Sequence, residues 1–199
     1  MKNLIVTQRH EMNKYYNEKR DCLDVRLINF IEEIKYKPIL IPSAIKNPKK
    51  FIFSNKPSAI ILSGGGDPRK KDLRSKIEFE LIKYSIKYKV PLLGICRGAQ
   101  ALNLFYGGKI TKIKNHVQNS HFIVGKVTRN KKIKVNSFHN FGIKKKLLSK
   151  KMEILGQSLD NNVECFKHKK LKQLGIMWHP ERYKVFRNFD LDLITKLYK

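Results

Sequence analysis

Residues 94–98, Gly-Ile-Cys-Arg-Gly, lie between an apolar run at 90–93 and a segment at 99–106 that has the pattern of a helix. A strand, a G-x-C-x-G turn and a helix in this order are typical of a nucleophile elbow, in which glycines permit a sharp turn and close packing. Cys96 then projects above a sheet edge at a helix N-terminus, where backbone N–H groups and the helix dipole favour a thiolate. The segment therefore predicts a strand-and-helix fold and a candidate nucleophile.

Short apolar runs alternate with helical patterns through the first half of the chain. We expect strands at 4–7, 39–41, 59–62 and 90–95, helices at 23–34 and 73–88, and a polar loop around Tyr15 and Tyr16. This alternation predicts βαβ units and a parallel sheet covered on both faces.

The pattern changes after Gly108. We expect strands separated by Lys/Asn turns and partly antiparallel, followed by a C-terminal helix, at 121–128, 133–136, 153–157, 163–166, 173–178 and about 188–197. The sequence thus predicts one α/β domain over residues 1–199, with a mostly parallel central sheet flanked by helices and additional antiparallel strands in the C-terminal half.

The chain is strongly basic, with 43 Lys and Arg against 16 Asp and Glu and a net charge of +27. A basic surface attracts phosphate-bearing partners, but lysines spread along the whole chain are also what A/T-rich coding would produce. We favour the compositional interpretation, because the lysines form no single arm and no nucleic-acid-binding signature accompanies them.

The three cysteines, at 22, 96 and 165, show no CxxC or Cys/His metal spacing, and no apolar stretch approaches the roughly 20 residues that span a bilayer. We therefore expect a cytoplasmic protein with free thiols, without a cofactor, a metal, a membrane or a nucleic-acid partner.

A catalytic cysteine needs a base, and His179 is the strongest of six histidines. It follows an apolar run at 174–178 and begins His-Pro-Glu. Extended chain places His179 and Glu181 on the same side, so that the carboxylate can hold the imidazole tautomer that accepts the thiol proton. Such a histidine is more often structural, but the end of a strand in an α/β sheet is where sites form.

The segment at 63–67, Ser-Gly-Gly-Gly-Asp, also follows an expected strand. Its glycines allow backbone N–H groups to approach a developing oxyanion closely. By itself the segment is equally consistent with a tight turn.

Together, residues 62–67, 94–100 and 178–181 resemble the class I glutamine amidotransferase family, in the same order and over nearly the whole chain. More narrowly, residues 96–103 and 135–139 are similar to the free-standing γ-glutamyl hydrolase branch (peptidase C26). The resemblance implies the flavodoxin-like amidotransferase fold. It assigns Cys96 as the nucleophile, His179 as the base and acid, and Glu181 as the group that orients His179.

The resemblance also implies an oxyanion hole and a glutamyl-binding surface. The backbone N–H groups of Gly64 and Arg97 would form the hole, with a surface cation as the alternative for the Arg97 side chain. The α-amino and α-carboxylate groups of the substrate would lie against Gly66, Gln100, Asn136, Ser137 and Phe138. Gln100 fits independently, because it follows Cys96 by one helical turn on the same face.

The implied reaction is attack of the thiolate on a γ-glutamyl amide, followed by hydrolysis of the glutamyl thioester and release of glutamate. Arg69, Lys70, Lys71 and Arg74 follow the glycine turn, and we expect them to rim the site, with Arg69 and Lys70 contacting phosphate. As a compact, Lys-rich member of this branch, the chain resembles hydrolases that cleave γ-glutamyl-CDP-amidate in capsular phosphoramidate biosynthesis. The implied partner is a small γ-glutamyl substrate linked to a nucleotide.

Two alternative hypotheses remain. In the first, the chain would be a glutaminase subunit that passes ammonia to a synthase partner, although such subunits more often carry Leu at the position of Arg97. In the second, it would be a catalytically idle basic protein that binds nucleic acid; the intact set of Cys96, His179 and Glu181 argues against this hypothesis.

Overall fold

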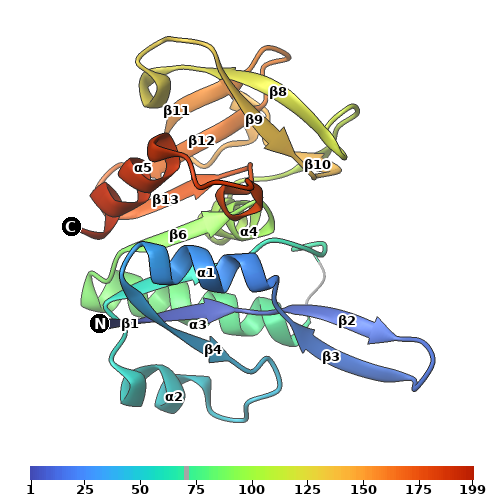
Figure 1. Ribbon diagram of the computed structural model, residues 1–199, viewed down its shortest axis with the longest axis vertical. Helices are drawn as coiled ribbons and strands as arrows, with labels where there is room; N and C mark the ends of the chain where they lie inside the picture. Colours follow the sequence, from blue (N-terminus) through green and yellow to red (C-terminus); the bar gives the residue numbers. More distant parts are fainter. Residues whose placement is uncertain (70–71) are drawn as a thin grey trace.

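The computed structural model describes residues 1–69 and 72–199, and nine of its strands form one mixed sheet (Figure 1). The order is β4-β1-β5-β6-β13-β12-β11-β8-β9. The first five strands pair in parallel: β4 (Tyr36–Ile41), β1 (Lys2–Thr7), β5 (Ala59–Leu62), β6 (Leu92–Ile95) and β13 (Gln173–Ile176). The sheet continues with antiparallel pairs through β12 (Val163–His168), β11 (Met152–Ser158), β8 (Asn119–Val124) and β9 (Ile133–Ser137).

Helices cover both faces of the parallel half. One face packs against α1 (Val25–Glu33) and α5 (Asn188–Tyr198), and the other against α2 (Pro48–Asn55), α3 (Leu73–Tyr88) and α4 (Arg97–Phe105). Because successive side chains of a strand point to opposite faces, Ile61 joins the first core and Ile60 the second, and both are fully buried. The α/β fold class expected from the sequence is confirmed.

The segment expected to be a polar loop is instead a β-hairpin, β2 (Arg9–Asn13) and β3 (Glu18–Cys22), which projects from the body of the molecule (Figure 1). Tyr15 and Tyr16 lie in its exposed turn, where Asn13 Oδ1 accepts hydrogen bonds from both of their backbone amides at 3.0 and 3.1 Å. The strands are polar on both faces, so they lack the apolar alternation by which a strand is recognised.

Other short elements were not expected. Helix α2 begins after Asn47, whose side chain caps it by accepting from the amide of Lys50. Two short strands, β7 (Thr111–Lys112) and β10 (Phe141–Gly142), form a separate pair. The strand expected at 121–128 ends at Val124 and is followed by a 3-10 turn, η1 (Lys126–Thr128). Two more 3-10 turns lie further along the chain, at η2 (Lys145–Leu147) and η3 (Pro180–Arg182).

Across the described ranges 1–69 and 72–199, we find no helix both long and apolar enough to cross a membrane.

The parallel register brings three strand ends together. Leu62 of β5 pairs with Gly94 of β6, and Ile95 of β6 pairs with Ile176 of β13. Three segments follow these strand ends: residues 63–67, which we call the glycine loop, the turn at Cys96 and the segment that carries His179. They meet at one edge of the sheet, the edge at which open α/β sheets bind ligands.

Candidate active site

Cys96 occupies a strained turn between β6 and α4. Its φ of 49° and ψ of −104° are rare for a residue with a side chain. A Cβ at Gly98 would lie 2.0 Å from the Leu62 carbonyl oxygen, and one at Gly94 would lie 2.6 Å from the carbonyl carbon of Gly98. The two glycines therefore let the helix pack directly on the strands, as an elbow requires.

The turn brings the Cys96 thiol to His179, and His179 to Glu181. Burial raises the pKa of the Cys96 thiol, whereas two groups beside it, the His179 imidazole and the backbone amide of Arg97, lower that pKa. The His179 Nδ1 to Glu181 Oε1 distance is 2.6 Å, and all three residues are buried. A carboxylate that accepts a hydrogen bond from Nδ1 orients the ring so that Nε2 can accept the proton of the thiol.

Burial opposes a charge on Cys96 and on His179, but their interactions outweigh it. At His179, burial lowers the pKa, while the Glu181 charge and the hydrogen bond with Cys96 raise it to about 9. At Cys96, burial raises the pKa, while the hydrogen bond and the charge of His179 lower it below its ordinary value. These directions favour a thiolate–imidazolium pair at neutral pH.

Two further contacts fix the position of His179. Asn136 Oδ1 accepts from the His179 amide at 2.8 Å, and Asn136 Nδ2 donates to the His179 carbonyl at 2.8 Å. On the other side, a Cβ at Gly64 would lie 2.5 Å from His179 Cε1. The imidazole therefore packs directly against the glycine loop, and only glycine leaves room for it.

A buried ion-pair network holds the glycine loop in place through hydrogen bonds to its carbonyl oxygens. Arg74 donates to the carbonyl oxygens of Ser63 at 2.6 Å, Gly64 at 3.1 Å and Gly65 at 2.8 Å. Its guanidinium also pairs with Glu78 at 3.0 Å, and Glu78 accepts a second hydrogen bond from Arg97. Because α3 carries Arg74 and Glu78 and α4 carries Arg97, the network links these two helices to each other and to the glycine loop.

These positions decide two questions about basic residues. The alternative role of Arg97 as a surface cation is excluded, because Arg97 is 1% exposed and pairs with the buried Glu78. The expectation that Arg74 rims the site is wrong, because the loop carbonyls and Glu78 hold this residue in the interior, where it is 2% exposed.

The residues expected to bind the glutamyl group lie in different environments. Gln100 donates to the Phe141 carbonyl at 2.7 Å, and the Ser137 hydroxyl donates to the His116 carbonyl at 2.7 Å, so both side chains are engaged within the protein. Gly66, at φ +82°, lies in the glycine loop over Arg97. Phe138 is 37% exposed, and its ring lies 5.7 Å from the His179 ring. Phe138 is therefore the member of this set whose side chain is open to a ligand.

Two arginine side chains lie over aromatic rings of segments that contribute to the site. Arg69 pairs with Asp67 at 2.7 Å, and its guanidinium lies 4.1 Å from the centre of the Phe141 ring. Lys70, the other expected phosphate contact, and Lys71 lie outside the described residues. Arg182 was not anticipated from the sequence, although it directly follows Glu181. Its guanidinium lies 4.4 Å from the centre of the Phe138 ring.

A lysine-lined cavity lies away from this site. It has a volume of about 790 Å³ and is lined in part by Lys167, Lys170, Lys172 and Lys196. It includes the start of β13 at Gln173, whereas His179 follows the opposite end of that strand. The concentration of lysines in this region is therefore separate from the chemistry at Cys96.

Comparison with known proteins identifies the class that this fold and site define. Residues 21–188 match the family described as glutamine amidotransferase class-I, and the chain belongs to that family.

The sequence is 33% identical over 196 residues to the γ-glutamyl-CDP-amidate hydrolase of Campylobacter jejuni, covering 94% of this chain and 93% of that protein. It is 34% identical over 164 residues to the carbamoyl phosphate synthase small chain of Aquifex aeolicus, and this match covers 77% of the chain but 42% of that protein. A solved glutamine amidotransferase from Thermotoga maritima aligns with a TM-score of 0.66 at 18% identity, covering 91% of this chain and 77% of that one.

Proposed function

We propose that the protein is a cysteine-dependent hydrolase of γ-glutamyl amides. The Cys96 thiolate attacks the amide carbonyl, and the oxyanion accepts hydrogen bonds from the backbone N–H groups of Gly64 and Arg97. His179 gives its proton to the departing amine, then takes one from the water that hydrolyses the glutamyl thioester. The contact between Cys96, His179 and Glu181 at the elbow is the observation that carries this proposal.

The proposed substrate is linked to a nucleotide, such as γ-glutamyl-CDP-amidate. The name of the Campylobacter jejuni relative supports this class, because the match extends over 94% of the chain. Arg69 and Arg182 support it further, since each guanidinium stacks on an aromatic ring near the site, Phe141 and Phe138. Guanidinium groups bind phosphate in a bidentate manner, so these two would hold the diphosphate of the leaving group, and a role in capsule modification would follow.

Charge reversal at Arg69 tests the substrate class. We expect Arg69→Glu to raise KM for γ-glutamyl-CDP-amidate roughly tenfold, the loss of a charge-assisted contact, and to leave turnover of γ-glutamyl-p-nitroanilide unchanged. Lys146→Glu is the matched control, because it changes the net charge equally at an exposed residue of η2. Equal losses on both substrates would contradict the assignment of the leaving group.

A glutaminase subunit that delivers ammonia to a synthase is the second candidate, because the chain also matches carbamoyl phosphate synthase small chains. This candidate predicts slow glutamine hydrolysis that rises when a synthase partner is added. The hydrolase proposal predicts full turnover of a γ-glutamyl amide by the isolated protein.

A further inference from the structure

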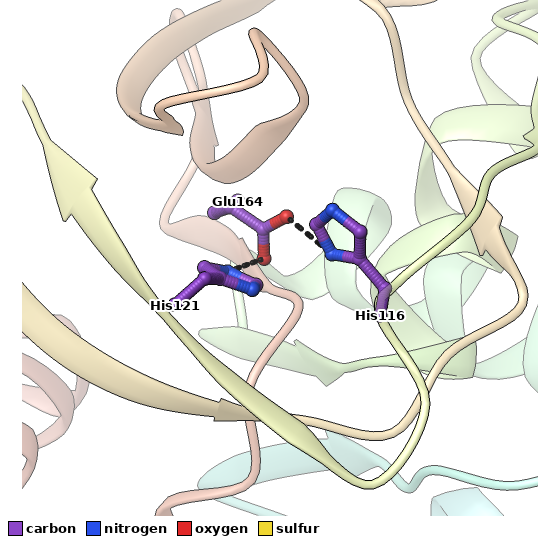
Figure 2. Close-up of side chains that lie close together, drawn as sticks. All are labelled: His116, His121 and Glu164. Atoms are coloured by element: carbon purple, nitrogen blue, oxygen red, sulfur yellow. Dashed lines mark ion pairs between the residues drawn. The ribbon is translucent and has the colours of Figure 1, made fainter.

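A second group of buried titratable side chains lies in the antiparallel half of the sheet. The Glu164 side chain, on β12, is fully buried, and histidines from the neighbouring segments surround it (Figure 2). His116 Nδ1 lies 3.7 Å from Glu164 Oε1, while His121 Nε2 and His139 Nε2 lie 3.3 and 3.7 Å from Glu164 Oε2. The four residues come from three strands or the loops beside them, and the nucleophile, base and orienter proposed above include none of them.

Hydrogen bonds on the far side of two rings fix their tautomers. The carboxylate of Asp160 lies 3.0 Å from His116 Nε2, and the carbonyl oxygen of Phe141 lies 3.0 Å from His139 Nδ1. Both oxygens are acceptors, so these two nitrogens carry the protons. His116 Nδ1 is then unprotonated and directs its lone pair at the Glu164 carboxylate. At His139, burial lowers the pKa, but the interactions with Glu164 raise it above its ordinary value and favour a proton on Nε2 as well.

Hydrogen bonding within this group is incomplete. Within the described part of the chain, neither carboxylate oxygen of Glu164 and neither ring nitrogen of His121 has a hydrogen-bond partner of acceptable geometry, and the same holds for His139 Nε2. Buried polar atoms are normally paired, and an unpaired buried carboxylate is costly. A cation between the rings and the carboxylate would pair with the Glu164 oxygens and with one ring nitrogen of His121.

The spacing suits a zinc ion in particular. Ligands held about 2.0–2.1 Å from a tetrahedral Zn²⁺ lie about 3.3–3.4 Å from each other. The distances of 3.3 and 3.7 Å around Glu164 are close to this value, and the ligand atoms of His116, His121 and Glu164 all lie within 4.8 Å of one another. Imidazole nitrogens with a single carboxylate favour Zn²⁺ over Mg²⁺ or Ca²⁺, which prefer oxygen ligands.

We propose that His116, His121 and Glu164 form a zinc site. These three ligands would tie β8 and the loop before it to β12, and a water molecule would complete the tetrahedral coordination. Asp160 holds His116 from behind, as outer groups do around metal-bound histidines. His139, whose Nε2 lies 3.7 Å from Glu164 Oε2, directly follows Phe138, whose ring contacts His179, so the ion would stabilise one wall of the active site.

Metal analysis of the full chain, with any affinity tag removed, tests this proposal. We expect about one zinc per chain by elemental mass spectrometry, and visible d–d absorption of a tetrahedral site when the chelator-treated protein is titrated with Co²⁺. Glu164→Gln and His121→Ala should each lower the zinc content at least tenfold. A zinc content near zero in correctly folded wild-type protein would overturn the proposal.

Two further variants keep the test decisive if removing a ligand impairs folding. Asp160 is half-exposed, and Asp160→Asn should weaken zinc affinity about 10–100-fold, the usual effect of losing an outer carboxylate. Asp192→Asn, at an exposed aspartate of α5, is the matched control and should leave affinity unchanged. Cys96→Ala should also retain the zinc. Loss of zinc in Cys96→Ala but not in Asp160→Asn would mean that the metal binds the active-site thiol, and the proposal would be wrong.

Discussion

The parallel and antiparallel halves of the sheet each assemble a buried group of titratable side chains, but from different kinds of sequence. In the parallel half, Cys96 and His179 follow the ends of neighbouring strands, and Glu181 lies two residues further on. In the antiparallel half, His121 and Glu164 lie within strands that are distant in sequence. Parallel topology collects strand ends at one edge, so short motifs there predict a site, whereas side chains on antiparallel strands meet through a register that no local motif records.

The two buried cysteines, Cys96 in the parallel half and Cys165 in the antiparallel half, allow this comparison to be tested by mutation. Cys96→Ala should lower kcat/KM for a γ-glutamyl amide by about 10⁴-fold or more, as loss of a nucleophile does. Cys165→Ala should leave it within about threefold, because Cys165 lies inside β12 and burial raises the pKa of its thiol. Initial rates of glutamate release measure both variants.

Metal content extends the same comparison. The Cys96→Ala protein should keep its zinc while losing activity, which would separate the functions of the two halves. Comparable activity losses in Cys96→Ala and Cys165→Ala would instead indicate a general packing defect and no dedicated nucleophile.

Gly64→Ala tests how closely the glycine loop and His179 must approach each other. The added Cβ would lie 2.5 Å from His179 Cε1, so the imidazole must shift away from the thiol. We expect a loss of about 10²–10³-fold in kcat, the size of effect produced by misplacing one catalytic group.

Gly107→Ala is the matched control, because a Cβ at Gly107 meets nothing within 4 Å although its φ is +82°. It should lower Tm modestly through backbone strain and leave kcat within about twofold. If Gly64→Ala kept full activity, His179 would not need the position described above.

The pH dependence of activity gives the smallest expected effect. Burial lowers the pKa of His179, but the Glu181 charge and Cys96 raise it to about 9, so the imidazolium persists through neutral pH and is lost above about pH 9. The log of kcat/KM should be flat through neutral pH and then fall by about one unit per pH unit. In Glu181→Gln the fall should begin at lower pH, since the charge that raises the pKa is removed; an unchanged profile would exclude His179 as the acid.

Stability should follow the same titration. The folded-state pKa of His179 lies above its ordinary value of 6.5, so its ion pairs stabilise the fold fully below pH 6.5. This contribution is lost as pH rises through about 9. Urea unfolding of the wild type at pH 7 and pH 10 should show the loss, and Glu181→Gln should reduce it.

Much of the parallel half was predictable from sequence, for a physical reason. Apolar runs such as 59–62 must be buried. The glycines at 64, 94 and 98 lie where a neighbouring backbone or ring occupies the space that a Cβ would need. Such constraints are local, so they appear in the sequence.

The remaining features depend on long-range pairing. The place of Arg97 under the glycine loop depends on Glu78, one helix earlier, and an isolated arginine in a turn gives no sign of such a partner. The hairpin β2–β3 lacks an apolar face, and the histidines around Glu164 are at irregular spacings. Only the assembled sheet brings these residues together.

Covalent trapping tests the central claim most directly. The protein would be treated with a glutamine-analogue electrophile and digested, and each cysteine-containing peptide would be analysed by mass spectrometry. The account predicts one adduct, on Cys96, that a γ-glutamyl amide suppresses in competition, with Cys22 and Cys165 unmodified. No adduct at Cys96, or equal labelling of the half-exposed Cys22, would contradict the assignment of Cys96 as the nucleophile of a γ-glutamyl hydrolase.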